Sequence, residues 1–158
     1  SASAFLASAN SQGQSGYWYY GPVMLDSAGK SLFMKDTSSA SSYTYDTLAM
    51  PATNGDFVSQ ANGEGARGYR YKGGFAFGSD IVVAYVKDAL QSPTFTYTAQ
   101  ASPTTSAAFV AQANAQGAQS AAWLASLVFG AGAINNFYFS AAHCAGVSCS
   151  SLNALTQN

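Results

Sequence analysis

Aromatic residues alternate with polar or small residues along 69–77 (YRYKGGFAF), and an apolar, β-branched run follows at 81–86. Period-two alternation is typical of a half-buried strand, and a continuous β-branched run is typical of a strand covered on both faces. Gly73 and Gly74 accept the positive φ angles of a tight hairpin turn. The stretch 68–88 therefore predicts a three-stranded antiparallel meander, which we take as the centre of the fold.

Segments with strand character flank this meander. Residues 17–25 (YWYYGPVML) and a return at 32–34 predict a second hairpin, with Gly21-Pro22 at a bulge or edge because proline cannot donate to a ladder. Two Asn-Gly pairs, at 54–55 and 62–63, predict tight turns around a short strand at 57–61. Further short strands are expected from Tyr43 to near Pro51, at 94–98 and at 134–139.

Apolar residues recur at three- and four-residue steps along 106–129, in an alanine-rich segment that follows Ser-Pro-Thr-Thr. This pattern predicts one long helix, interrupted near Gly117. Residues 1–14 are expected to form an N-terminal arm or the end of a short helix. The predicted fold class is α+β, with a single antiparallel sheet packed against the long helix in one extracellular domain that spans 1–158.

Aromatic pairs two residues apart recur along the chain, and the first four pairs are about 26 residues apart. Such pairs stand on one face of a strand and stack across neighbouring strands. Because the intervening residues do not match at this spacing, we interpret the pairs as an aromatic layer of one sheet and not as a sequence repeat. The alternative is an exposed platform that stacks on sugar rings, formed by Tyr17, Trp18, Tyr19, Tyr20, Tyr69 and Tyr71.

Charge is scarce and unevenly placed. Only 8% of the residues are charged, against roughly 25% in an average soluble protein, and all of them fall between Asp26 and Asp88. A net charge of −1 argues against a nucleic-acid partner, because phosphate binding needs a field of basic side chains. Arg67, Arg70 and Lys72 lie close together in the sequence and are interpreted as a solvated strand face, with a small binding patch as the alternative.

The two cysteines, Cys144 and Cys149, are separated by four residues near the C-terminal end. In a chain so poor in charge they predict a local disulfide formed outside the cytoplasm, in a secreted, cell-surface or periplasmic protein. Only His143 lies near them, so we expect no metal site. The apolar stretch 123–142 is interrupted by glycines and an Asn-Asn pair, and we therefore expect no membrane span.

Catalytic motifs are weak. The hexapeptide 139–144 (FSAAHC) resembles the histidine motif of trypsin-like serine proteases, but no GDSGG-type serine follows it. No phosphate-binding loop is present, and we expect neither a cofactor nor, on balance, an enzyme.

Three hypotheses of function remain, and the first is favoured. It is a non-enzymatic extracellular structural subunit, either a pilin-like filament component or an adhesive surface protein, that self-assembles or binds protein partners. Surfaces without charge are poorly protected against association and therefore favour this role. The layout of helix, sheet and C-terminal disulfide loop is similar to that of type IV pilin domains, although their hydrophobic N-terminal helix is not in this sequence. The second hypothesis is a secreted carbohydrate-binding module that uses the aromatic platform. The third is a small secreted hydrolase.

Overall fold

The computed structural model describes residues 1–38 and 40–145 and shows an α+β fold with three small antiparallel sheets. The described helices are α1 (Ala2–Gln14), α2 (Asn54–Ala66) and α3 (Ser106–Gly117). The described strands are β1 (Trp18–Leu25), β2 (Ala28–Met34), β3 (Tyr43–Ala49), β4 (Arg70–Phe77), β5 (Asp80–Asp88), β6 (Thr94–Ala101), β7 (Ala122–Leu127) and β8 (Asn135–Ala142). The fold class is thus confirmed, whereas the expected single sheet with one long helix is wrong.

The chain is a tandem repeat with a period of 52 residues. The three helices begin at residues 2, 54 and 106, and each is followed by a β-hairpin whose first strand begins at residue 18, 70 or 122. In the first two units a third strand follows, β3 or β6. Helix residues recur at the same spacing: Phe5, Phe57 and Phe109; Ala9, Ala61 and Ala113; Asn10, Asn62 and Asn114; Gly13, Gly65 and Gly117. Our interpretation of the aromatic pairs as something other than a repeat is therefore wrong.

The units are joined by shared strands. Strand β3 of the first unit pairs with β5 of the second, which gives the sheet order β3-β5-β4. Strand β6 of the second unit pairs with β8 of the third in the same way, which gives the order β6-β8-β7. The third strand of one unit therefore completes the sheet of the next unit. The β1–β2 hairpin forms a sheet of its own.

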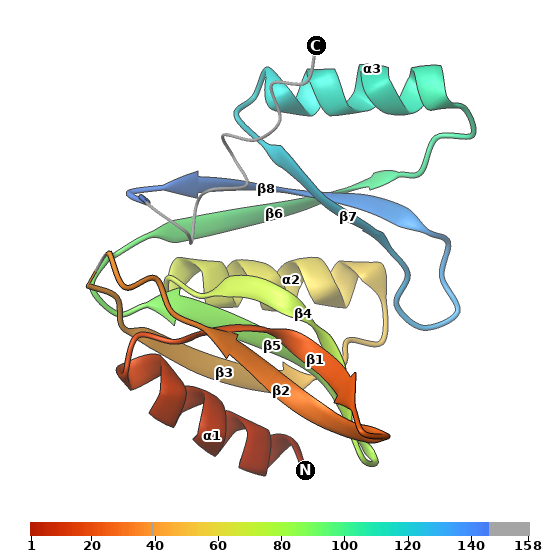
Figure 1. The fold of residues 1–158 in the computed structure, drawn as a ribbon. Helices are drawn as coiled ribbons and strands as arrows, with labels where there is room; N and C mark the ends of the chain where they lie inside the picture. The colour runs from red at the N-terminus through yellow and green to blue at the C-terminus, as the bar shows by residue number, and fades with distance from the viewer. Residues whose placement is uncertain (39, 146–158) are drawn as a thin grey trace.

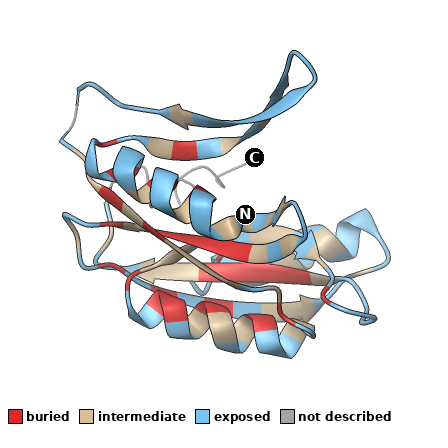
Figure 2. Ribbon diagram, turned by 90° about the horizontal axis from the view of Figure 1, so that it is seen from below, coloured by how far each residue is buried: buried red, intermediate tan, exposed pale blue. Residues whose placement is uncertain are grey.

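Helices and sheets alternate along the molecule. Figure 1 shows α2 between the β3–β5–β4 sheet and the β6–β8–β7 sheet, with α3 on the outer side of the latter. Helix α1 contacts β3, β4 and β5 and also β1, so it lies between the β3–β5–β4 sheet and the β1–β2 hairpin (Figure 2). Each central strand is therefore covered on two faces, and the buried residues gather on β5 and β8 (Figure 2).

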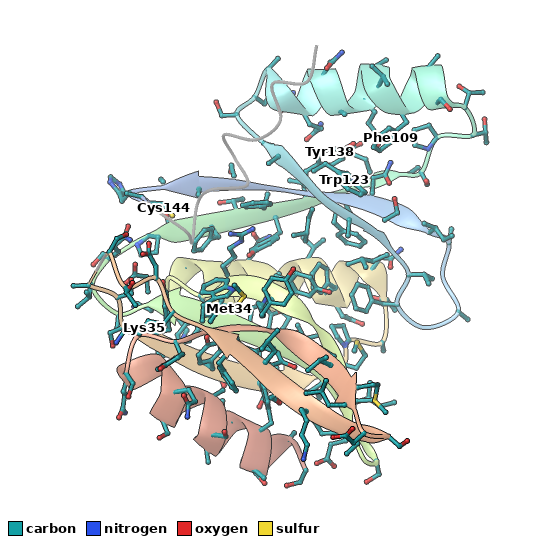
Figure 3. The ribbon with its side chains drawn as sticks, viewed as in Figure 1. Met34, Lys35, Phe109, Trp123, Tyr138 and Cys144 are labelled. Atoms are coloured by element: carbon teal, nitrogen blue, oxygen red, sulfur yellow. The ribbon has the colours of Figure 1, made fainter. Side chains whose placement is uncertain are left out.

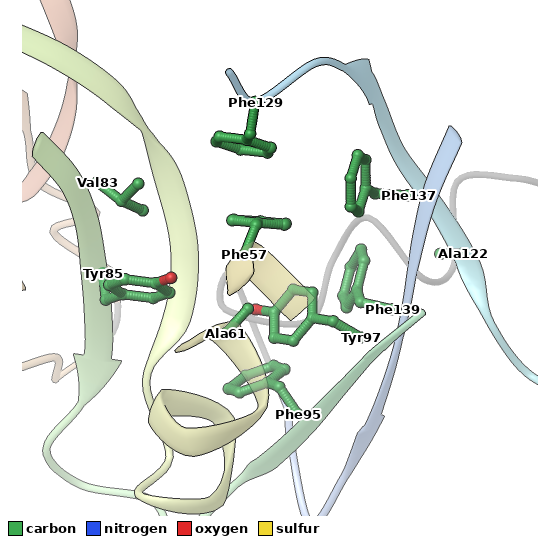
Figure 4. Close-up of a cluster of buried hydrophobic side chains, with 10 residues drawn as sticks. All are labelled: Phe57, Ala61, Val83, Tyr85, Phe95, Tyr97, Ala122, Phe129, Phe137 and Phe139. Atoms are coloured by element: carbon green, nitrogen blue, oxygen red, sulfur yellow. The ribbon is translucent and has the colours of Figure 1, made fainter. Parts of the chain in front are cut away.

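Two aromatic cores fill the spaces between these layers. The larger one surrounds Phe57 of α2, whose ring lies 4.6 Å from Phe129 and 5.0 Å from Phe137 (Figure 4). The second surrounds Phe5 of α1, whose ring lies 4.4 Å from Phe77 and 4.9 Å from Tyr19. Each core thus joins a helix of one unit to the hairpin of the following unit.

The predicted helix over 106–129 ends at Gly117, because the chain reverses through Ser120, which has a φ of 60°, and continues as β7. Trp123 and Leu127 are four residues apart, which fits a helix, but both belong to a strand that pairs with β8. A β-bulge between Trp123 and Ala125 disturbs the alternation that would have revealed the strand.

Two further expectations fail in the middle of the chain. The segment 57–61 is part of α2 and not a strand, because Thr53 caps the helix by accepting from the Asp56 amide at 3.1 Å. The Gly73-Gly74 pair lies inside β4 next to a bulge, and the hairpin turn lies at 78–79 instead. The stretch 68–88 is therefore one hairpin, whose third strand comes from β3 and not from a meander.

Several expectations are confirmed. The N-terminal segment forms α1, and the second hairpin forms as β1–β2 with a bulge between Tyr19 and Gly21. The strands expected from Tyr43 to near Pro51, at 94–98 and at 134–139 correspond to β3, β6 and β8. These are segments in which local alternation and turn residues agree with the final fold.

Each of the first two helices approaches the third strand of its own unit so closely that only glycine fits. A Cβ atom at Gly13 would overlap the carbonyl of Tyr43, and one at Gly65 would overlap the carbonyl of Phe95. At the equivalent Gly117 no atom lies within 4 Å of such a Cβ. The same glycine position is therefore a packing requirement in two units and open in the third.

Alanine at these positions should separate the two situations. We expect Gly65→Ala to destabilise the protein by about 1–3 kcal/mol through overpacking, and Gly117→Ala to be neutral or stabilising by up to about 1 kcal/mol through helix propensity. Urea unfolding followed by circular dichroism measures both variants. Equal effects of the two substitutions would contradict the close helix–strand contact.

Candidate functional site

Tyrosine hydroxyls tie the third strands to the hairpins. The Oη atom of Tyr45 on β3 accepts a hydrogen bond from the Tyr19 amide at 2.6 Å, and that of Tyr97 on β6 accepts from the Tyr71 amide at 2.7 Å. In each case the amide lies next to the β-bulge of the hairpin in the same unit. The tie therefore satisfies a backbone donor near the point where the bulge disturbs the strand ladder.

Asparagines on the helices clamp the same strands. The Asn10 side chain accepts from the Tyr45 amide at 2.7 Å and donates to the Tyr45 carbonyl at 3.2 Å. Asn62 does the same to Tyr97, at 2.7 and 3.1 Å. The equivalent Asn114 is exposed. A primary amide carries both a donor and an acceptor, which explains why this residue type suits a two-bond contact with one backbone residue.

Contacts between charged and polar side chains also cross the unit boundaries. The Nη1 atom of Arg67 lies 2.6 Å from a Glu64 carboxylate oxygen and 3.3 Å from an Asp46 carboxylate oxygen on β3. In the next layer, the Gln112 amide donates to the Ala101 carbonyl at 2.9 Å, as Gln60 donates to the Ala49 carbonyl at 3.0 Å. Gln60 and Gln112 thus each bind the last residue of the third strand of the preceding unit, which is Ala49 of β3 or Ala101 of β6.

The expected solvated face of basic residues is correct for Arg67, which is exposed, and wrong for Arg70 and Lys72. Arg70 is half-buried, and its guanidinium lies 4.9 Å from the ring centre of Phe139 in the neighbouring sheet. Lys72 is also half-buried and lies 5.3 Å from the ring centre of Trp18. Burial lowers the pKa of both groups from the ordinary range. These cations lie between layers, where aromatic rings replace part of their hydration.

Matching strand registers define equivalent positions in the three hairpins. The pairs Tyr19–Phe33, Tyr71–Tyr85 and Trp123–Tyr138 each stand directly before a bulge. Counting from these pairs, Leu32 of β2 is equivalent to Ala84 of β5 and Phe137 of β8, and Met34 is equivalent to Val86 and Phe139. All four of these equivalents in β5 and β8 are buried.

The β2 strand differs from β5 and β8 because its outer edge has no partner in the described structure. Strands β5 and β8 are central strands of three-stranded sheets, whereas β2 pairs with β1 alone. Every β2 residue except the half-buried Phe33 is exposed, and Leu32 and Met34 retain 40% and 53% of their accessible surface. Figure 2 shows this strand in pale blue along most of its length, and Figure 3 marks Met34 at its end. An exposed, partly apolar edge strand is a ready template for pairing. We take this edge as the candidate functional site.

The six residues of the predicted aromatic platform do not share one surface. Tyr19 is fully buried in the core around Phe5, so it is not available to a sugar. Tyr71 packs edge-on against Phe57 at 5.1 Å, and Tyr69 lies under Arg67 and Lys87. Trp18 is half-buried against Tyr43, whereas Tyr17 and Tyr20 are 36% and 64% exposed. Whether the exposed rings bind a glycan stays a prediction.

The cysteine and histidine expectations concern the end of the described chain. Cys144 is described, but Cys149 lies outside the described residues, so the disulfide stays a prediction. His143 is exposed, with a φ of 55°. Within 1–38 and 40–145, no group of three or more His, Cys, Asp or Glu side chains could hold a metal ion. None of the helices in the same ranges has the length and apolar character that a membrane crossing requires.

Burial of three tyrosines makes stability depend on alkaline pH. Tyr45, Tyr85 and Tyr97 are nearly or fully inaccessible, and burial raises the pKa of each above its ordinary value of 10.0. A raised folded-state pKa means that the unfolded chain releases these protons first, so this contribution is complete below pH 10 and declines above it.

We therefore expect the free energy of unfolding to fall above pH 10 by up to about 1.4 kcal/mol per pH unit for each tyrosine. Urea unfolding at a series of pH values measures the slope. Tyr45→Phe should make the decline shallower while lowering stability at neutral pH, since the Tyr19 amide loses its acceptor. A pH-independent stability well above pH 10 would show that the three hydroxyls ionise freely in the folded protein.

Comparisons with known proteins provide no family for this chain. No family model, no curated protein and no solved structure matches it. The unit boundaries and the open edge of β2 must therefore be interpreted from the geometry of the chain itself. That geometry supports an interaction site built from backbone groups and apolar side chains.

Proposed function

We propose that this protein is a non-enzymatic, extracellular structural subunit whose repeat units stack by sharing strands. The observation that carries the proposal is that β3 pairs with β5 and β6 pairs with β8, so that each unit completes the sheet of the next. Repeat proteins of this kind are stabilised mainly by contacts between neighbouring units. A scaffold or filament is a natural use for such an additive architecture.

The surface chemistry supports the same proposal. Residues 1–25 and 89–158 contain no Asp, Glu, Lys or Arg, and several of their apolar side chains are exposed, among them Met24, Leu25, Leu90 and Val110. Charge normally protects a small domain against association. Neutral ends with exposed apolar residues therefore favour a protein whose ends are covered by other molecules.

The repeated side-chain contacts hold each third strand on its own unit in a fixed geometry. In the first two units the third strand is held by an asparagine clamp, a tyrosine tie and a glycine-limited helix approach, and the distances agree closely between the two copies. Such agreement favours a rigid stack with a constant step. A rigid, repeating stack suits a load-bearing or surface-spacing role better than a role that requires opening and closing.

Size-exclusion chromatography with light scattering, followed by negative-stain imaging, tests the proposal. We expect oligomers that grow with protein concentration and elongated particles in the images. Because association is mainly apolar, added salt should leave it unchanged or strengthen it. A protein that remains monomeric at every concentration would be evidence against the assembly role.

A carbohydrate-binding function is the second candidate, favoured by the exposed ring of Tyr20. If this function is correct, Tyr20→Ala should abolish retention on a glycan column, since an exposed tyrosine ring is the stacking surface. Val110→Ala on α3 is a matched control, because Val110 is also exposed but offers no ring. Equal glycan retention by the wild-type protein and both variants would exclude a role of the Tyr20 ring in glycan binding.

A further inference from the structure

Helix α2 contains two Asn-Gly pairs, a dipeptide that is more typical of turns than of helices. Asn54-Gly55 lies in the first turn of the helix, and Asn62-Gly63 lies in its second half. At the equivalent positions of α1 and α3 no asparagine is followed by glycine. The two pairs are therefore particular to the middle helix, and they place one dipeptide in two environments.

An asparagine that precedes a glycine loses its side-chain amide without an enzyme, and asparagine is among the thermolabile residues for this reason. The backbone nitrogen of the glycine attacks the asparagine Cγ atom, and the amide group leaves as ammonia with the proton of that nitrogen. Water then opens the resulting succinimide ring to aspartate or isoaspartate, so the chain gains a negative charge. Glycine favours the reaction because it has no Cβ atom to obstruct the approach of its nitrogen.

The Asn54 side chain ties the start of α2 to the β7–β8 loop of the third unit. Its Oδ1 atom accepts a hydrogen bond from the Phe129 amide at 3.0 Å, and its Nδ2 atom donates to the Ala133 carbonyl at 2.8 Å. Figure 1 shows this loop reaching toward the start of α2. A Cβ atom at Gly130 would overlap the Ala52 carbonyl, so the loop lies directly against the residues before the helix. The tie therefore positions the loop that carries Phe129 into the larger core.

The backbone around the two glycines differs in a way that matters for the reaction. The first backbone bond of α2 runs from the Phe57 amide to the Thr53 carbonyl at 3.0 Å, so the Gly55 amide precedes the helical ladder. The Gly63 amide lies inside the helix, where each amide bonds the carbonyl four residues earlier. Attack by the Gly63 nitrogen therefore requires that a helical turn opens, whereas attack by the Gly55 nitrogen requires only fraying of the helix start.

The two asparagine side chains are also held by different partners. Asn62 binds both backbone groups of Tyr97, which is buried on the central side of the second unit. Asn54 binds a loop in which residues 130–134 are exposed. Release of Asn62 therefore requires displacement of a core strand, whereas release of Asn54 requires displacement of a surface loop.

We propose that Asn54 is a site of spontaneous deamidation in the folded protein, and that the new carboxylate releases the β7–β8 loop from α2. A carboxylate at this position still accepts from the Phe129 amide but cannot donate, and its charge faces the Ala133 carbonyl oxygen. Isoaspartate also adds one atom to the main chain, which moves the side chain away from both partners. Because a negative charge is favourable at a helix N-terminus, α2 itself is not weakened and the effect falls on the loop.

This modification goes beyond the proposed structural function and does not depend on it, because a monomer reacts in the same way as an assembly. It is irreversible, and it acts on the contact between the second and third units. The third unit is therefore expected to become more loosely attached as the protein ages.

Peptide mapping by mass spectrometry after incubation at mildly alkaline pH measures the reaction at each asparagine. In the folded protein we expect Asn54 to react at least about tenfold faster than Asn62, because the helix interior opens less often than its end. In concentrated urea the two rates should be equal, since both pairs then lie in an open chain. Equal rates in the folded protein, or a faster reaction at Asn62, would overturn the proposal.

Two glycine substitutions are a matched test of the attacking nitrogen. The nearest packing atom to a Cβ at Gly55 is the Thr53 hydroxyl oxygen at 3.7 Å, and none lies within 4 Å at Gly63, so both alanine variants should fold. Gly55→Ala should slow the reaction at Asn54 by about tenfold or more, and Gly63→Ala should leave that rate unchanged. Equal slowing by both variants would mean that overall stability sets the rate, which contradicts direct attack by Gly55.

Asn54→Asp reproduces the charge of the product and tests the release of the loop. Hydrogen exchange of the amides in 130–134 should be about fivefold faster in this variant, because the loop loses one hydrogen bond. Ser59→Asp is the matched control, since Ser59 is exposed on the same helix and the added charge is equal. Circular dichroism verifies that both variants are folded. Unchanged exchange of 130–134 in Asn54→Asp, or an equal increase in both variants, would refute the release of the loop.

Discussion

A two-stranded hairpin cannot bury both of its faces or pair both of its edges, and the rest of this structure depends on that constraint. The β4–β5 and β7–β8 hairpins are each completed by a third strand and a helix from the preceding unit. The central strands β5 and β8 become buried as a result, whereas β2, which has the same place in its unit, remains exposed. Burial of these central strands therefore depends on contacts between neighbouring units.

The polar contacts explain why the boundary geometry repeats so closely. Backbone groups at a bulge or on the helix side of a shared strand would be unsatisfied when buried, which is unfavourable by about 1–3 kcal/mol for each group. Tyr45 and Tyr97 satisfy the amides next to two bulges, and Asn10 and Asn62 satisfy the groups of the strands themselves. Apolar packing drives the layers together, and these four side chains set their register.

The sequence predicted the elements whose pattern is local. The β1–β2 hairpin, β6 and β8 follow from alternation and turn residues, but α2 was missed because its Asn-Gly pairs favour turns while Thr53 and the packing of Asn62 against β6 favour a helix. The repeat was missed for a different reason. Each complete unit contains two aromatic pairs, so the pairs recur at half of the true period, and the residues between them match only at 52 residues.

The candidate site was not predictable from residue chemistry, because an open edge consists of backbone groups that every residue carries. Leu32 and Met34 resemble ordinary strand residues until the register shows that their equivalents are buried in both other hairpins. The fold therefore identifies the site by comparison of the molecule with itself.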